Sequence, residues 1–193
     1  PEAVLPMLTL LRDKDPVVVD ETLIAIQQIG PTARPVVPGL MSVLKTGTDE
    51  RKHEALHALA AIGPGSETAQ TAIREYLNSD NKRLKIAAAI ALSRINPDDT
   101  EPLESILPEA IAALNSEDVH VQRQAGRLLA FMGPVAVAEL AKVVEEGNPK
   151  ICWRACDALA EIGPDAQSSV SALAKMVGSD DERVCWHAIR AIG

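Results

Sequence analysis

Aromatic side chains are scarce in this sequence of 193 residues, which contains two Trp, one Tyr and one Phe. A core therefore has to be built from Ala, Leu, Ile and Val, the mixture expected of closely packed helices. A β-rich fold, whose strands favour aromatic side chains, is disfavoured. Hydrophobic residues make up 47% of the chain and charged residues 24%. This is the composition of an ordinary soluble protein, which excludes disordered and fibrous classes.

Long hydrophobic runs are also absent. The longest apolar run, Ile86 to Leu92, is far shorter than the roughly 18 residues that a membrane span needs, so no membrane insertion is expected. The first six residues contain neither the basic region nor the apolar stretch of a secretory signal. Only three cysteines are present, and Cys152 and Cys156 lie one helical turn apart. We expect no disulfide framework, which favours a reducing compartment such as the cytoplasm.

Acidic side chains outnumber basic ones, and the whole excess lies in the second half of the chain. The net charge is −8. Residues 1–96 carry 11 basic and 11 acidic side chains, whereas residues 97–193 carry 8 and 16. Nonspecific binding to nucleic acid or to an anionic membrane depends on surplus Lys and Arg. Neither is expected as a partner.

What the sequence does contain is an internal repeat. Five helix-like stretches end on an apolar residue followed by Gly-Pro or Asn-Pro, and the closing residues are Gly30, Gly63, Asn96, Gly133 and Gly163. Their spacings are 33, 33, 37 and 30 residues, and a period of about 20–50 residues indicates a stacked array. Six helix pairs are predicted, at about 1–30, 31–63, 64–96, 97–133, 134–163 and 164–193. The longer link between Asn96 and Pro102 predicts a loop or local bend.

The second helix of each pair has marked boundaries. Counting back from each closing residue, apolar or small side chains recur 12, 8, 5, 4 and 1 positions earlier, which is a helical stripe. Short acceptor side chains that can cap free backbone N–H groups precede these stretches. They are Asp15, Asp49, Asp80, Asp118, Asn148 and Asp181. Gly, or Asn96, is expected to supply the left-handed residue that ends each helix.

A second apolar helix precedes each capped helix, and three of these first helices carry an internal proline, Pro6, Pro38 or Pro108. Such a proline bends a helix. A bent first helix, a straight second helix and a tight Gly-Pro link resemble HEAT repeats, especially the short HEAT-like repeats found in phycobilisome lyases. The resemblance covers the whole chain and implies an all-α fold, an α-α superhelix of the HEAT/armadillo type. That superfamily contains scaffolds, adaptors and a few enzymes.

The ends of the chain carry no polar capping repeat, and the last helix stops three residues short of its closing position. Because terminal repeats of an array normally have a polar outer face, we expect residues 1–193 to form a single array that is either a portion of a longer one or part of a protein whose ends are disordered.

The outward positions of the second helices vary from repeat to repeat, unlike the apolar stripe. In HEAT arrays this face lines the concave surface, so we predict a non-catalytic surface there that binds a protein or peptide. Its predicted residues are His53, His57, Arg123, Arg127, Trp153, Asp157, Trp186 and Arg190. Two Trp beside several Arg, with Arg154 and His187 adjacent, have the composition of a binding hot spot. The partner is expected to offer apolar anchors and a carboxylate. Alternatively, both Trp pack into the seam between repeats.

Three patterns suggest chemistry instead of binding. His53-Glu54-Ala55-Leu56-His57 matches the His-Glu-x-x-His zinc signature, although a third ligand would have to come from Asp20, Glu21, Glu67 or Glu75. This His-Glu pair also resembles the metal-binding dyads of deoxyhypusine hydroxylase. The cysteines with His187 offer a second metal set, for which packing of buried thiols is the favoured interpretation.

The third pattern consists of Trp153 and Asp157 with Trp186, and it resembles the arrangement used by HEAT-like alkylpurine DNA glycosylases. An enzyme or lyase component is therefore the alternative to a binding module. We predict no catalytic residue, no metal and no cofactor.

Overall fold

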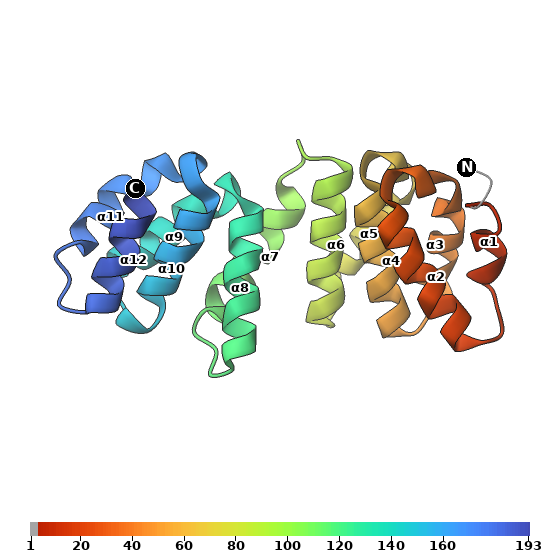
Figure 1. Ribbon diagram of the computed structural model, residues 1–193, viewed down its shortest axis with the longest axis horizontal. Coiled ribbons are helices and arrows are strands. Elements are labelled where there is room, and N and C mark those ends of the chain that lie inside the picture. The colour runs from red at the N-terminus through yellow and green to blue at the C-terminus, as the bar shows by residue number, and fades with distance from the viewer. Residues whose placement is uncertain (1–3) are drawn as a thin grey trace. The chain divides into compact units, whose positions relative to one another are not determined.

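The computed structural model describes residues 4–193, and the chain divides into two compact units between Ser105 and Ile106 (Figure 1). All regular elements within the described residues are helices. The expected all-α repeat fold is therefore confirmed. Residues 1–3, where the first predicted repeat begins, lie outside the described residues. Whether the two units act as one array stays a prediction.

The first unit holds three helix pairs. The second helices of these pairs, α2 (Pro16–Ile29), α4 (Asp49–Ile62) and α6 (Lys82–Ile95), lie side by side and form one layer (Figure 1). The other layer consists of α1 (Met7–Leu10), η1 (Gly30–Val36) with α3 (Val37–Thr46), and η2 (Gly63–Ala69) with α5 (Gln70–Arg74) and η3 (Glu75–Asn78).

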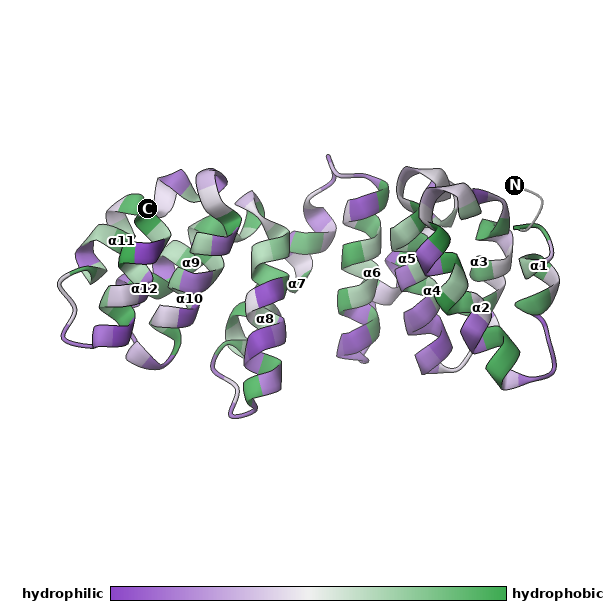
Figure 2. Cartoon of the chain, viewed as in Figure 1, coloured by the Kyte–Doolittle hydropathy of each residue, from purple (hydrophilic) through white to green (hydrophobic). Residues whose placement is uncertain are grey.

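The second unit repeats this arrangement. Its second helices are α8 (Val119–Met132), α10 (Pro149–Ile162) and α12 (Glu182–Ile192), and α10 packs against both of the others. The first helices are α7 (Glu101–Ala113), which begins before the division at Ser105, α9 (Pro134–Glu146) and η4 (Gly163–Ser169) with α11 (Val170–Met176). Figure 2 shows hydrophilic (purple) and hydrophobic (green) bands alternating along these second helices.

The N-terminal caps confirm four of the six predicted capping residues. The side chains of Asp15, Asp118, Asn148 and Asp181 each accept a hydrogen bond from a backbone N–H in the first turn. The other two predictions were wrong by one residue. Thr48 caps α4, which leaves Asp49 in the first turn, where a negative charge suits the helix dipole. Asn81, and not Asp80, caps α6.

The closing glycines adopt a conformation that differs from the expected left-handed one. Gly30, Gly63, Gly133 and Gly163 have φ between 57° and 72°, but their ψ lies between −131° and −135°. These are the angles of the first central residue of a type II′ turn, which strongly favours Gly. Asn96 is extended, with φ −135° and ψ 90°. Its predicted left-handed conformation was therefore wrong.

The first helices differ in how they begin. The links at Gly30, Gly63 and Gly163 each open a 3₁₀ segment of 7 residues, whereas Pro134 begins α9 directly. Pro108 lies inside α7, a helix of 13 residues. The bend expected at the internal prolines stays a prediction.

The predicted loop after α6 is confirmed. The chain leaves α6 at Asn96 and does not become helical again until Glu101. Arg74 of α5 holds this loop against the first unit, since its guanidinium forms ion pairs with Asp99 and, at 2.9 Å, with Glu101. The extra residues of the longest repeat therefore form an anchored loop.

The centre of the predicted apolar stripe forms the core of each unit. In α2 the positions 8 and 4 before the closing glycine are Thr22 and Ile26, and both are buried. In α10 the same positions are Ala155 and Leu159, which have no exposed surface. The margins of the stripe are partly exposed, as at Ile151. Ala at many of these positions allows neighbouring helices to approach closely.

Removing a leucine from this stripe should destabilise the second unit strongly. Leu129 and Leu159 are fully buried, so truncation to Ala leaves a cavity and should lower the free energy of unfolding by about 2–5 kcal/mol. Urea unfolding followed by circular dichroism measures this. Gln124→Ala, at an exposed position of α8, is the control and should change stability little. Losses under about 0.5 kcal/mol at both leucines would show that the helix faces are assigned wrongly.

Candidate partner-binding site

The two tryptophans of the predicted binding surface differ in exposure. Trp186 on α12 keeps 58% of its surface exposed, whereas Trp153 on α10 is half-buried. Arg123, Arg127 and Arg190 are exposed as well. Trp186 therefore does not fill the seam between repeats, and Trp153 combines packing with a surface position.

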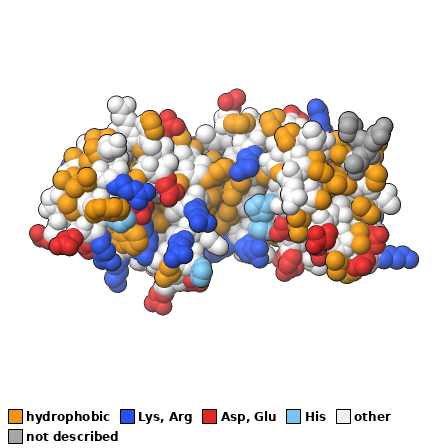
Figure 3. Space-filling model, in the orientation of Figure 1, with side chains coloured by type: hydrophobic (Ala, Val, Ile, Leu, Met, Phe, Trp, Pro, Cys, Tyr) orange, Lys and Arg blue, Asp and Glu red, His pale blue; other side chains and the backbone are white. Residues whose placement is uncertain are grey.

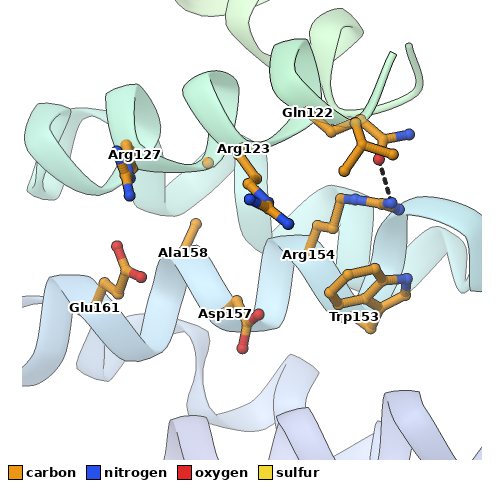
Figure 4. Close-up of a pocket in the computed structure, with 10 residues that line it drawn as sticks. Gln122, Arg123, Arg127, Trp153, Arg154, Asp157, Ala158 and Glu161 are labelled. Carbon is orange, nitrogen blue, oxygen red and sulfur yellow. Dashed lines mark hydrogen bonds between the residues drawn. The ribbon is translucent and has the colours of Figure 1, made fainter. Parts of the chain in front are cut away.

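An open groove of about 320 Å³ runs between α8 and α10 (Figure 4). Arg123 and Arg127, one turn apart on α8, form one wall, and Asp157 and Glu161, one turn apart on α10, form the other. Trp153 lies at one end. Small residues make the room, since Gly126 and Ala158 line the groove and a Cβ at Gly126 would meet nothing within 4 Å.

The charges in the groove differ in how far they are already satisfied. Within residues 4–193, Arg123, Arg127 and Glu161 take part in no ion pair. Asp157, by contrast, pairs with His187 and, at 3.1 Å, with the guanidinium of Arg190. The groove therefore presents two uncompensated guanidinium groups and one uncompensated carboxylate to a partner.

Arg154 differs from these arginines because the protein holds it in place. Its guanidinium donates to the side-chain oxygen of Gln122 on α8 and, at 2.5 Å, to the carbonyl of Lys150 (Figure 4). It also lies 4.2 Å from the ring centroid of Trp153, a cation–π contact. Partial burial, with a smaller contribution from Arg183, lowers the pKa of Arg154, but a guanidinium stays charged. Arg154 thus fixes one face of Trp153.

His187 joins the two tryptophans. Its ring centroid lies 5.1 Å from that of Trp153 and 4.7 Å from that of Trp186, the latter edge to face. Its Nδ1 pairs with the carboxylate of Asp157, and Arg190 lies 5.9 Å from the Trp186 ring centroid. The sequence pattern predicted His187 beside the hot spot but not at its centre. The available signal was its register, since His187 and Arg154 both directly follow a Trp.

The basic residues of the second unit gather on its second helices. Of the 8 in residues 97–193, two lie on first helices, Lys142 and Lys175, and both pair with a glutamate. The other six are Arg123, Arg127, Lys150, Arg154, Arg183 and Arg190. A second hollow of about 430 Å³ shares Trp153 and Arg154 with the groove and extends to Lys150 and Arg183. Figure 3 shows blue side chains of Lys and Arg beside orange, hydrophobic ones over α8, α10 and α12.

His53 and His57 lie in the first unit, on α4, and are not part of this cluster. Both are partly exposed. The His53 Nδ1 lies 3.2 Å from a carboxylate oxygen of Glu54, and the two His Nε2 atoms lie 3.3 Å apart. Burial and the nearby His53 lower the pKa of His57, against the opposing charge of Glu54. Partial burial raises the pKa of Glu54, but hydrogen bonds from Gln27 and His53 bring it below its usual value.

The sets considered for metal binding do not converge on three ligands. Within residues 4–193, no three or more His, Cys, Asp or Glu side chains are grouped as they would be around an ion. Asp20, a candidate third ligand for the histidine pair, is instead bonded to Arg51 at 2.8 Å. Cys152 and Cys156 are fully buried, as the packing interpretation predicted, whereas Cys185 is only half-buried.

Comparisons with known proteins support the repeat fold. Residues 107–193 match the family model for HEAT repeats. An engineered protein of known structure is similar with a TM-score of 0.53 and 24% identity, over 98% of this chain and 95% of its own. A second engineered protein is similar with a TM-score of 0.50 and 25% identity, over 98% of this chain and 57% of its own. A designed armadillo repeat protein in complex with the peptide (KR)4 is similar with a TM-score of 0.53 and 17% identity, over 97% of this chain and 98% of its own. No curated protein matches significantly.

The chain is therefore an α-solenoid repeat protein whose fold is like that of HEAT and armadillo repeat proteins, and residues 107–193, which include the groove, match the family model for HEAT repeats. No helix within residues 4–193 is long and apolar enough to cross a membrane. The closer resemblance to the repeats of phycobilisome lyases stays a prediction.

The three thiols should differ sharply in reactivity. Cys152 and Cys156 have no exposed surface, and their shared hydrogen bond together with burial raises the pKa of Cys156. A buried thiol cannot reach a reagent, and only the thiolate reacts. In the native protein we expect one fast-reacting thiol with Ellman's reagent, and its loss in Cys185→Ser. Fast reaction of two thiols in that variant would contradict the burial.

Proposed function

We propose that the outward face of α8, α10 and α12 is a non-catalytic binding surface for a segment of another protein or a peptide. The observation that carries this proposal is the groove between α8 and α10, which is open and lined by three charged side chains, Arg123, Arg127 and Glu161, that form no ion pair within the described residues. Armadillo and HEAT folds are used for this purpose, and the similar designed armadillo protein is in complex with a peptide.

The preferred segment carries a carboxylate. Arg123 and Arg127 are exposed and lie one turn apart, so that together they can grip one carboxylate or two neighbouring ones with charge-assisted hydrogen bonds. Of the 16 acidic side chains in residues 97–193, two line the groove, Asp157 and Glu161, and the others lie outside it, where they repel acidic partners from other faces. The bound peptide of the designed armadillo protein is basic. This groove favours the opposite charge.

Apolar anchors of the segment pack on the tryptophans. Trp186 exposes enough surface to cover an aliphatic or aromatic side chain, and Trp153 offers its edge at the end of the groove. Contacts within the protein already hold both rings in place: Arg154 packs on Trp153, and His187 and Arg190 contact Trp186. Because little ordering is needed on binding, such rigid aromatics make effective hot spots.

The residues that line the groove favour binding over catalysis. The lining contains no Ser, Thr, Cys, Lys or Tyr, and its only side chains of a nucleophilic type are the carboxylates of Asp157 and Glu161. Asp157, which the glycosylase-like alternative would use, is held by His187 and Arg190. A role of His53 and His57 in binding the same partner is a separate prediction, because they belong to the first unit.

Selection from a random peptide library displayed on phage tests the proposal and does not require that the partner be known. Peptides enriched on the immobilised chain should combine an aromatic or aliphatic residue with Asp or Glu. Trp153→Ala with Trp186→Ala should weaken their binding by about 2–4 kcal/mol, or about 30- to 1,000-fold, as measured by calorimetry. Lys142→Ala on α9 is the matched control and should have little effect.

Charge reversal distinguishes specific binding in the groove from nonspecific binding to the rest of the surface. Arg123→Glu with Arg127→Glu should abolish binding of the acidic peptides, since like charges then face each other across the contact. Enrichment of basic peptides, or equal binding by the double Trp variant with loss of folding stability, would refute the proposal. In the second case the indoles would only stabilise the packing of α10 and α12.

A further inference from the structure

The two histidines of α4, His53 and His57, lie unusually close together, and the proposed binding of a peptide in the groove does not explain why. His53 and His57 are one turn apart, and their ring centroids are 4.5 Å from each other. Their Nε2 atoms are closer than the centroids, at 3.3 Å. The two rings therefore converge on their Nε2 atoms, which are the ring atoms that commonly bind metal ions.

The separation of these nitrogens matches that of two ligands on one metal ion. Zn²⁺ bound tetrahedrally at about 2.0–2.1 Å from each imidazole places the two nitrogens about 3.3–3.4 Å apart. In the metal-free protein one Nε2–H can donate to the other Nε2 across the same gap. An ion would replace that proton once the rings turn so that both Nε2 lone pairs point at it.

Glu54 and Gln27 hold the His53 ring in an orientation suited to metal binding. The Glu54 carboxylate lies 3.2 Å from the His53 Nδ1, and Gln27 on α2 holds that carboxylate by donating to its other oxygen at 2.8 Å. Gln27 also lies 3.2 Å from the Glu54 carbonyl. An Nδ1–H bonded to a carboxylate leaves the Nε2 lone pair free. Metal-binding histidines in proteins are oriented by this type of contact.

We infer that His53 and His57 form a two-ligand site for Zn²⁺ or a similar divalent transition-metal ion, with water or a group from a bound partner in the remaining positions. Two protein ligands are the limit here, since residues 4–193 supply no third one and Asp20 is engaged by Arg51. The site is therefore an open, exchangeable one, unlike a closed structural zinc site. The inference does not depend on the proposed function.

Calorimetric titration of the purified 193-residue chain with zinc chloride, in a buffer that does not chelate metals, tests the inference. We expect one Zn²⁺ per chain, loss of saturable binding after His53→Asn or His57→Asn, and about 10- to 100-fold weaker binding after Glu54→Gln, as is typical of such supporting carboxylates. His120→Asn, at an exposed position of α8, is the matched control and should bind zinc normally.

A measurement on the unmodified chain covers the case in which a variant fails to fold. Zinc should shift the side-chain nitrogen resonances of two of the four histidines, which the single variants assign to positions 53 and 57, and leave those of His120 and His187 unchanged. Zinc binding that survives His53→Asn with His57→Asn would place the ion elsewhere, for example on the cysteines. That result, or the absence of saturable binding, would overturn the inference.

Discussion

The turn that closes four of the six second helices is the constraint on which the rest of the structure depends. At Gly30, Gly63, Gly133 and Gly163 the backbone has positive φ with ψ between −131° and −135°, and a proline follows directly. Only Gly adopts such angles without strain. Backbone conformation and not space requires the glycine, since a Cβ at Gly30 would meet the Ala61 carbonyl at an ordinary contact distance of 3.5 Å. The repeated turn fixes where these four helices end, and therefore which of their positions face outward.

The binding face follows from that constant register. Positions 10 and 6 before the closing glycine are Arg123 and Arg127 on α8 and Trp153 and Asp157 on α10. Because both helices end in the same way, these pairs meet across the space between the helices. Glycine and alanine inside that space keep it open. The uniform stripe holds the unit together, while the variable positions give it a particular charge and shape.

The fold could be predicted because its signals are local and repeated. The apolar period, the caps at Asp15, Asp118 and Asn148 and the Gly-Pro links each lie within a few residues of the feature that they determine. The errors at Asp49 and Asp80 arose where a second acceptor stood next to the predicted one. Either residue could cap a helix, and the backbone path decides between them.

The candidate site was only partly predictable because its contacts join residues about 30 positions apart. The register placed Trp153, Trp186 and the arginines on one face. It could not show that His187 lies between the indoles or that Arg154 is bonded to Gln122 while Arg123 is not. Side-chain rotamers and inter-helix distances decide such contacts. The same holds for the histidine pair, where the sequence predicts a shared helix face but not the distance between the two Nε2 atoms.

The most direct test of the central claim is a map of backbone amide shifts in the NMR spectrum as an acidic, aromatic-containing peptide is added to the chain. If the outward face of the second helices binds the segment, the largest shifts will lie on α8, α10 and α12, including residues next to Arg127 and Trp153. Shifts confined to α9 and α11, on the first helices, would contradict the account.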